Sequence, residues 1–144
     1  MASVFAGAKL YKNGGDGKVL DASVLEGKTL GLYFSAHWCP PCRNFTPLLK
    51  DFHAELEDDG EFEIVFVSFD RNETDLNNYL KEAHGNWYYL ALGDELIQSL
   101  SAKYEVSGIP ALIILKPNGE LVTKNGRADV QAKPPPQALK AWTA

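Results

Sequence analysis

Residues 29–43 read Thr29-Leu-Gly-Leu-Tyr-Phe-Ser-Ala-His-Trp-Cys-Pro-Pro-Cys-Arg43. The first seven residues form a compact apolar run, which is typical of a buried central strand. The run leads directly into Cys39 and Cys42, the only two cysteines of the chain. Two cysteines placed at random in a chain of this length would lie three apart roughly once in seventy cases. The junction after this strand is therefore the first candidate for chemistry.

The segment that follows predicts a helix over residues 40–58. Its apolar residues recur at helical spacing and form one stripe. These residues are Phe45, Leu48, Leu49, Phe52 and Leu56. We expect Pro47 to kink the helix, because proline removes one backbone donor, and we expect the helix to end at Gly60.

Cys39 falls at the N-cap of this helix, where the positive end of the helix dipole favours a thiolate. Pro40 and Pro41 fit the first helical positions, where amide hydrogens have no intrahelical partner. Their missing donors leave the amide of Cys42 as the expected backbone donor to the Cys39 sulfur. Arg43 adds a nearby positive charge.

The rest of the chain alternates between strand and helix patterns, without internal repeats. Strands are predicted over 63–69, 111–115 and 120–123, and helices over 74–84, from the Asp94 cap to Tyr104, and over 137–142. Residues 9–11 and 18–20 flank a turn cluster and could pair as a small N-terminal hairpin. This order predicts a single α/β domain over residues 1–144, with a mixed sheet and helices on both faces. Chemistry in such sheets lies at the carboxyl ends of strands.

Composition limits the classes of function. The chain has 144 residues, of which 45% are hydrophobic and 23% charged, with a net charge of −5. The acidic balance argues against nucleic-acid or membrane binding driven by bulk electrostatics. Residues 1–8 show no basic export signal, and the longest apolar runs are too short to span a bilayer. We expect a monomer in a reducing compartment, the cytoplasm, with the nucleus as an alternative.

A dithiol at this place predicts thiol–disulfide exchange. Cys39 would be the nucleophile, and Cys42, one turn into the helix, would resolve the mixed disulfide and form the Cys39–Cys42 bond. Trp38 would shield one side of the sulfur and offer apolar surface to a substrate. The simpler alternative is a pair of buried cysteines that only packs. Structural zinc is a weaker alternative, because none of the three histidines has finger-like spacing. We expect neither metal nor organic cofactor.

Trp38-Cys-Pro-Pro-Cys-Arg43 resembles the active site of the tryparedoxin and nucleoredoxin group within the thioredoxin superfamily. The lead-in at residues 33–38 is similar to the same group. Further matches are residues 67–71, Trp87, Ile109-Pro110, Asn118-Gly119 and Gly126-Arg127. Two positions depart from the group: Ala91-Leu92 replaces a proline-aromatic pair, and Arg71 replaces an acidic residue that tryparedoxins often carry.

The resemblance implies a thioredoxin fold and a protein-disulfide reductase. It implies disulfide-containing protein substrates and, as electron donor, a dithiol or a thioredoxin-reductase-type protein. By the same resemblance, Pro110 is cis and packs against the active-site disulfide, the Ile109 backbone pairs with an extended substrate, and Arg127 lies near the dithiol. A redox-sensitive adaptor that binds a signalling partner in a thiol-dependent way is the alternative function.

Supporting residues have simpler interpretations too. Tyr33 stands where thioredoxins usually bury an acid, so the proton for Cys42 would come from water, Asp70 or Tyr33 itself. Tyr33 could equally be a core aromatic residue, and Asp70 a capping residue. Arg127 could be a surface charge.

The three histidines and two further segments favour structural roles. His37, His53 and His84 are expected at the surface, and residues 87–89 in the core. Residues 134–136 favour a stiff polyproline connector.

Overall fold

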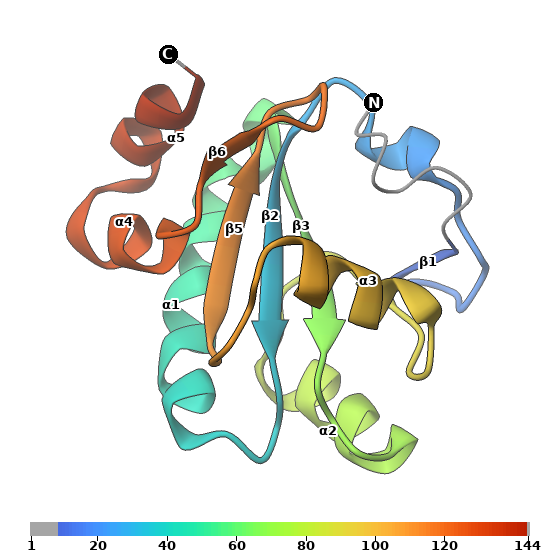
Figure 1. Ribbon diagram of the computed structural model, residues 1–144. Helices are drawn as coiled ribbons and strands as arrows, with labels where there is room; N and C mark the ends of the chain where they lie inside the picture. Colours follow the sequence, from blue (N-terminus) through green and yellow to red (C-terminus); the bar gives the residue numbers. More distant parts are fainter. Residues whose placement is uncertain (1–8, 144) are drawn as a thin grey trace.

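The computed structural model describes residues 9–143, and these form a six-stranded mixed sheet (Figure 1). The strands are β1 (Leu10–Lys12), β2 (Thr29–Ser35), β3 (Phe62–Ser68), β4 (Tyr88–Leu90), β5 (Ala111–Leu115) and β6 (Leu121–Thr123). Their order across the sheet is β1-β4-β3-β2-β5-β6. The inner pairs β2/β3 and β3/β4 are parallel, and the β1/β4, β2/β5 and β5/β6 pairs are antiparallel. The predicted mixed sheet is confirmed.

Helices cover both faces of the sheet. They are α1 (Pro40–Leu56), α2 (Glu73–Ala83), α3 (Glu95–Lys103), α4 (Gly126–Ala132) and α5 (Pro135–Thr143), with short 3₁₀ turns η2 (Ala22–Leu25) and η3 (Glu57–Asp59). One core joins the sheet to α1, α2 and α5, and a second joins the opposite face to α3 and η2. Within the described part of the chain, no helix is long and apolar enough to cross a membrane.

Local sequence accounts for where the helices begin. Asn72 accepts a hydrogen bond from Asp75 N and caps α2, and Asp94 accepts one from Leu96 N and caps α3. The 17-residue α1 begins with two prolines and contains Pro47. The 3₁₀ turn η3 follows α1 directly, and its C-cap, Gly60, takes a left-handed conformation with φ 66°, which glycine adopts without steric cost.

The structure corrects three sequence predictions. The N-terminal hairpin is reduced to one bridge between Leu10 and Leu20, because β1 pairs along its length with β4 instead. Pro135 and Pro136 begin α5 rather than a polyproline connector, since proline is tolerated in a first helical turn. Helix α4 and strand β4 are not among the predicted elements. The prediction that no export signal is present concerns residues 1–8, and these lie outside the described residues.

Candidate active site

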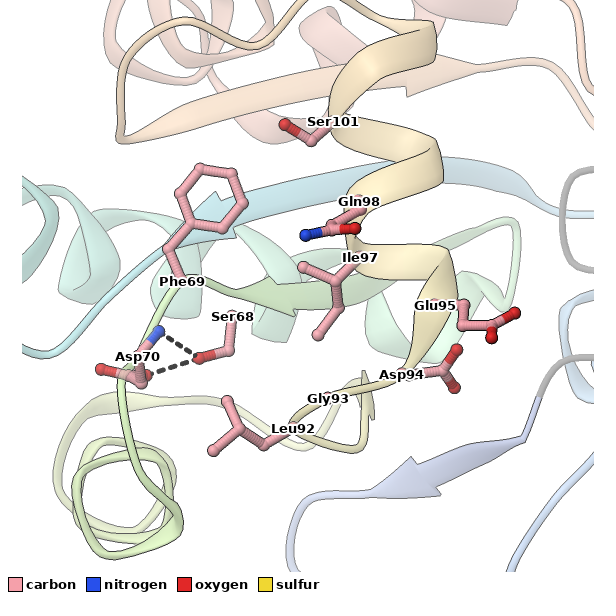
Figure 2. Close-up of a pocket in the computed structure, with 10 residues that line it drawn as sticks. All are labelled: Ser68, Phe69, Asp70, Leu92, Gly93, Asp94, Glu95, Ile97, Gln98 and Ser101. Atoms are coloured by element: carbon pink, nitrogen blue, oxygen red, sulfur yellow. Dashed lines mark hydrogen bonds between the residues drawn. The ribbon is translucent and has the colours of Figure 1, made fainter.

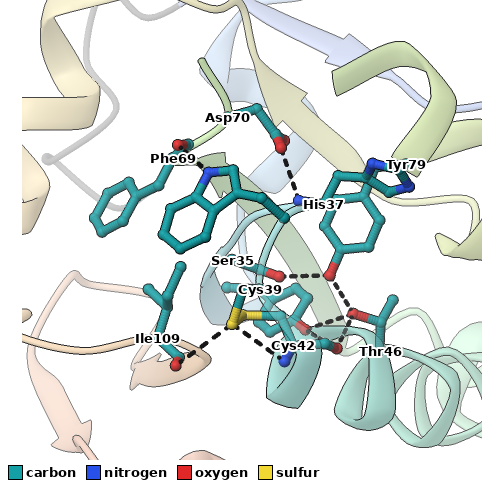
Figure 3. The surroundings of a disulfide bond; sticks show 11 residues. Ser35, His37, Cys39, Cys42, Thr46, Phe69, Asp70, Tyr79 and Ile109 are labelled. Carbon is teal, nitrogen blue, oxygen red and sulfur yellow. Dashed lines mark hydrogen bonds between the residues drawn. A yellow bond between two sulfur atoms is a disulfide. The ribbon is translucent and has the colours of Figure 1, made fainter. Parts of the chain in front are cut away.

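The dithiol lies where β2 ends and α1 begins, at the carboxyl edge of the central strands. Cys39 and Cys42 form a disulfide with a Cα–Cα distance of 5.2 Å. Cys42 is fully buried, and Cys39 is only 4% exposed. Cys39 is the N-cap of α1, and Cys42 N donates to its sulfur at 3.3 Å, which is the contact predicted from the prolines. Figure 3 shows this arrangement, with the carbonyl oxygen of Ile109 3.7 Å from Cys39 Sγ.

Trp38 is the largest exposed apolar side chain beside the disulfide, with 45% of its surface exposed. Its Nε1 donates to the carbonyl of Phe69 at 3.1 Å, which fixes the indole against the end of β3. The guanidinium of Arg71 lies 5.2 Å from the indole ring centroid, within the range of a cation–π contact. Phe69 also packs against the two cysteines. Trp38 and Phe69 therefore give the dithiol an apolar border.

Asp70 is buried beside the loop that leads into the dithiol. Its Oδ1 accepts from His37 N at 2.7 Å, and its Oδ2 accepts from Ser68 Oγ at 2.7 Å. The carboxylate thus fastens the end of β3 to the residue two positions before Cys39. This geometry matches the simpler interpretation of Asp70, and its part in proton transfer stays a prediction.

Behind Cys42, buried hydroxyl groups occupy the space under the first turn of α1. Tyr33 OH lies 2.6 Å from Thr46 Oγ1, which is also 2.6 Å from Tyr79 OH. Ser35 Oγ lies 2.5 Å from Tyr79 OH, and Thr46 Oγ1 donates to Cys42 O at 2.8 Å. Burial raises the pKa of Tyr33 and Tyr79 above that of a free phenol, so both hydroxyls stay protonated. Sequence reasoning found Tyr33 but missed the other three hydroxyl groups of this cluster, those of Ser35, Thr46 and Tyr79.

The structure places the other predicted residues around this centre. The Ile109–Pro110 peptide bond is cis and Pro110 is buried, in agreement with the resemblance. Arg127, at the start of α4, places its guanidinium 5.8 Å from the ring centroid of Phe45 on α1. Arg43 is exposed in the first turn of α1, beside Pro40 and Pro41, which are exposed as well. The roles assigned to these residues stay predictions.

A cavity of about 480 Å³ is shown with its lining residues in Figure 2. One of these residues, Phe69, also packs against the cluster of Ala36, Cys39 and Cys42. The end of β3, the loop before α3 and one face of α3 line the cavity. Its apolar wall is Phe69, Leu92 and Ile97, and its polar groups include Gln98 and Asp94. Ile97 lies on α3, the helix predicted from the Asp94 cap to Tyr104.

The surface predictions for His53 and His84 are wrong, because both side chains are buried, whereas His37 stays partly exposed. His37 is half-buried, with its Nε2 3.3 Å from Glu82 Oε2. His53 is 3% exposed and lies 2.7 Å from Glu63 Oε1. His84 packs within the aromatic core around Trp87. Trp87 itself is in the core, as predicted.

A family model described as thioredoxin-like matches residues 27–121. Among solved structures, a thioredoxin from Wuchereria bancrofti is 52% identical with a TM-score of 0.85, covering 99% of this chain and 98% of that one. Tryparedoxin I from Leishmania major is 37% identical with a TM-score of 0.80, covering 88% and 86%.

Curated relatives include the nucleoredoxin of Mus musculus, which is 44% identical over 129 residues. That match takes in 88% of this chain and 28% of the relative, so the chain spans little more than a quarter of that protein's length. Nucleoredoxin-like protein 1 of Homo sapiens is 34% identical over 142 residues, or 91% of this chain and 67% of the relative.

Proposed function

This chain belongs to the thioredoxin-like family of oxidoreductases, and on that premise we propose that it reduces protein disulfides through Cys39 and Cys42. One observation carries the proposal. The Cys39 sulfur caps the N-terminus of α1 and accepts the Cys42 amide at 3.3 Å. An amide donor and a helix N-terminus are the two groups that stabilise a thiolate.

The reaction proceeds by two exchanges between sulfur atoms. The Cys39 thiolate attacks one sulfur of the substrate disulfide, forms a mixed disulfide and releases the first substrate thiolate, which takes a proton from water. Cys42 then loses its thiol proton and attacks Cys39 Sγ. The Cys39–Cys42 bond forms, and the second substrate thiolate leaves. The substrate gains two electrons, the dithiol loses two, and an external dithiol or a thioredoxin-reductase-type donor restores the reduced pair.

Substrate recognition is proposed for the surfaces beside Cys39. The Ile109 carbonyl, 3.7 Å from Cys39 Sγ, is placed to accept from the backbone of an extended segment. Trp38 and Phe69 give that segment an apolar border, and Arg127 adds a positive charge at α4. We propose that no metal or organic cofactor takes part, and that the protein works in the cytoplasm or the nucleus.

Turnover of insulin disulfides with dithiothreitol tests this function. Wild type should accelerate the reduction, and Cys39→Ser should not, because it lacks the attacking sulfur. Cys42→Ser should trap a covalent mixed disulfide that dithiothreitol releases, because Cys39 still attacks but nothing resolves the product. A folded, reduced wild type without any acceleration contradicts a general reductase.

A redox-sensitive adaptor is the second candidate, favoured by the half-exposed indole of Trp38 next to the disulfide. Such an adaptor would hold its partner without a covalent bond and release it when Cys39 and Cys42 are oxidised. Binding that survives in Cys39→Ser, with no mixed disulfide in Cys42→Ser, would select the adaptor over the reductase.

A further inference from the structure

The hydroxyl cluster of Ser35, Tyr79, Thr46 and Tyr33 joins three elements at one point behind the disulfide. Tyr33 and Ser35 come from β2, Thr46 from α1 and Tyr79 from α2. All four residues are fully buried, so the cluster is shielded from solvent. Figure 3 shows the hydroxyl groups of Ser35, Tyr79 and Thr46 converging beside Cys42.

Counting protons fixes the direction of each bond in the cluster. A hydroxyl has one proton to donate, and a carbonyl has none. The bond from Thr46 to Cys42 O therefore uses the Thr46 proton. Thr46 Oγ1 must then accept from both Tyr33 and Tyr79, and Tyr79 must accept from Ser35. Four protons serve these four bonds. Tyr33 OH also lies 3.4 Å from Cys42 O, a fifth and longer contact for the same Tyr33 proton, so the chain of donors ends on the carbonyl of Cys42.

The two backbone polar groups of Cys42 are therefore held on opposite sides. Its carbonyl accepts a hydrogen bond from Thr46 Oγ1 at 2.8 Å, and its N–H donates to Cys39 Sγ at 3.3 Å. The same residue carries the thiol that closes the disulfide. We propose that the hydroxyl cluster positions Cys42, aligning both the amide that stabilises the Cys39 thiolate and the thiol that resolves the mixed disulfide.

This inference deepens the proposed function and rests on it for the resolving step. The four hydroxyls belong to positioning residues: Thr46 and Tyr33 hydrogen-bond the Cys42 carbonyl, and Tyr79 and Ser35 act through Thr46. All four hydroxyl protons are used in hydrogen bonds within the cluster or to the Cys42 carbonyl. The cluster therefore aligns Cys42 without donating a proton to its thiol. The proton that Cys42 gains or loses is exchanged elsewhere.

Thr46→Val is the central test, since valine keeps the shape of threonine and removes the hub hydroxyl. Thr46→Ser restores the hydroxyl, and Tyr79→Phe removes a second hydroxyl while keeping the ring. Thr143→Val is the matched control, because Thr143 Oγ1 makes the same kind of bond to Leu139 O in α5. Single-turnover mixing with a disulfide peptide separates attack from resolution. Alkylation by iodoacetamide at varied pH gives the midpoint at which Cys39 becomes reactive.

Folded Thr46→Val and Tyr79→Phe should resolve the mixed disulfide about fivefold more slowly, the kinetic equivalent of one neutral hydrogen bond. Their alkylation midpoints should rise by a few tenths of a pH unit, and attack should slow less than resolution. Thr46→Ser should recover both properties, and Thr143→Val should match wild type.

Wild-type resolution and an unshifted midpoint in the two folded variants would overturn the inference. So would Thr46→Ser behaving like Thr46→Val at equal stability, because the hydroxyl would then be irrelevant. If wild type exchanges no disulfide at all, the proposed function fails instead. The alkylation midpoint still decides the positioning role in that case, since it needs no protein substrate.

Discussion

At the scale of single residues, His84 is a buried titratable group whose pKa is strongly lowered by its surroundings. It lies among the rings of Tyr33, Phe66, Tyr79 and Trp87. Trp87 Nε1 donates to His84 Nδ1 at 3.0 Å, so the ring proton is on Nε2, which has no hydrogen-bond partner among the described residues. Burial lowers the pKa of His84 to about 3, because the charged form would lose its hydration.

We expect His84 to destabilise the fold in acid. Folding lowers the pKa of His84. The stabilisation that the neutral ring gives to the folded state is therefore complete above the pKa of the unfolded chain, near 6.5, and is lost as the pH falls toward 3. The slope is at most about 1.4 kcal/mol per pH unit. Urea unfolding at pH 7.5 and pH 4.5 measures it. His84→Gln, which keeps an acceptor for Trp87, should lose less stability over this range than wild type; equal losses would rule out His84 as the cause.

Residue-scale prediction from sequence succeeded where the geometry is local. The contact between the Cys42 amide and Cys39 Sγ follows from an N-cap three positions earlier and two prolines without amide hydrogens. His53 and His84 were misplaced, because their burial depends on aromatic and acidic partners brought in by other elements. Thr46 was missed for the same reason: besides Cys42 in its own helix, its partners Tyr33 and Tyr79 come from β2 and α2.

At the scale of elements, α4 sits unusually close to the sheet. A Cβ built on Gly126, its first residue, would lie 2.9 Å from the side chains of Ile114 and Leu112 and from the Leu112 carbonyl. The absence of a side chain thus lets the helix start against β5. The next residue, Arg127, is thereby held over the ring of Phe45.

Gly126→Ala should lower the free energy of unfolding by about 1–3 kcal/mol, because the added methyl group overpacks a contact that includes backbone. Gly108→Ala is the matched control, since a Cβ there meets nothing within 4 Å. Urea denaturation of both variants beside wild type is the measurement. A Gly126→Ala variant as stable as Gly108→Ala would mean that α4 moves away from β5 without cost.

The length and strength of the apolar pattern in each segment decided whether its strand or helix could be predicted from the sequence. The apolar runs of β2 and β5 have the predicted bounds, because four to seven consecutive buried residues leave little ambiguity. Strand β4 has three residues and became a strand through its pairing with β1 and β3. Helix α4 has seven residues, starts with glycine and has no side-chain cap, so its sequence carries no helical signal.

At the scale of the whole molecule, the disulfide state and the stability of the fold are linked. Cys39 and Cys42 are three positions apart, so the bond closes a short loop. Closing a loop of this size lowers the entropy of the unfolded chain by an amount equivalent to about 2 kcal/mol. This entropy difference adds to the free energy of unfolding of the oxidised protein. The reduced protein lacks it, although the same fold still holds both thiols.

We therefore expect oxidised protein to unfold at a higher urea concentration than reduced protein. Urea titrations with and without dithiothreitol give the difference. The Cys39→Ser/Cys42→Ser double variant is the control, because dithiothreitol should not move its midpoint. Equal midpoints for oxidised and reduced wild type would show that thiol contacts in the reduced fold offset the entropy term completely.

Pro47 has a consequence for how the first turn of α1 is attached. Proline has no amide hydrogen, so the carbonyl of Arg43 loses its usual donor four residues on. Both residues are exposed, whereas the neighbouring bond from Thr46 to Cys42 lies on the buried side. The first turn of α1, which carries the dithiol, is thus open to water on its exposed side and is held by the Thr46 hydrogen bond on its buried side. Bond making and breaking at sulfur can be absorbed as a tilt of this single turn, while the remainder of the helix keeps its register against the sheet.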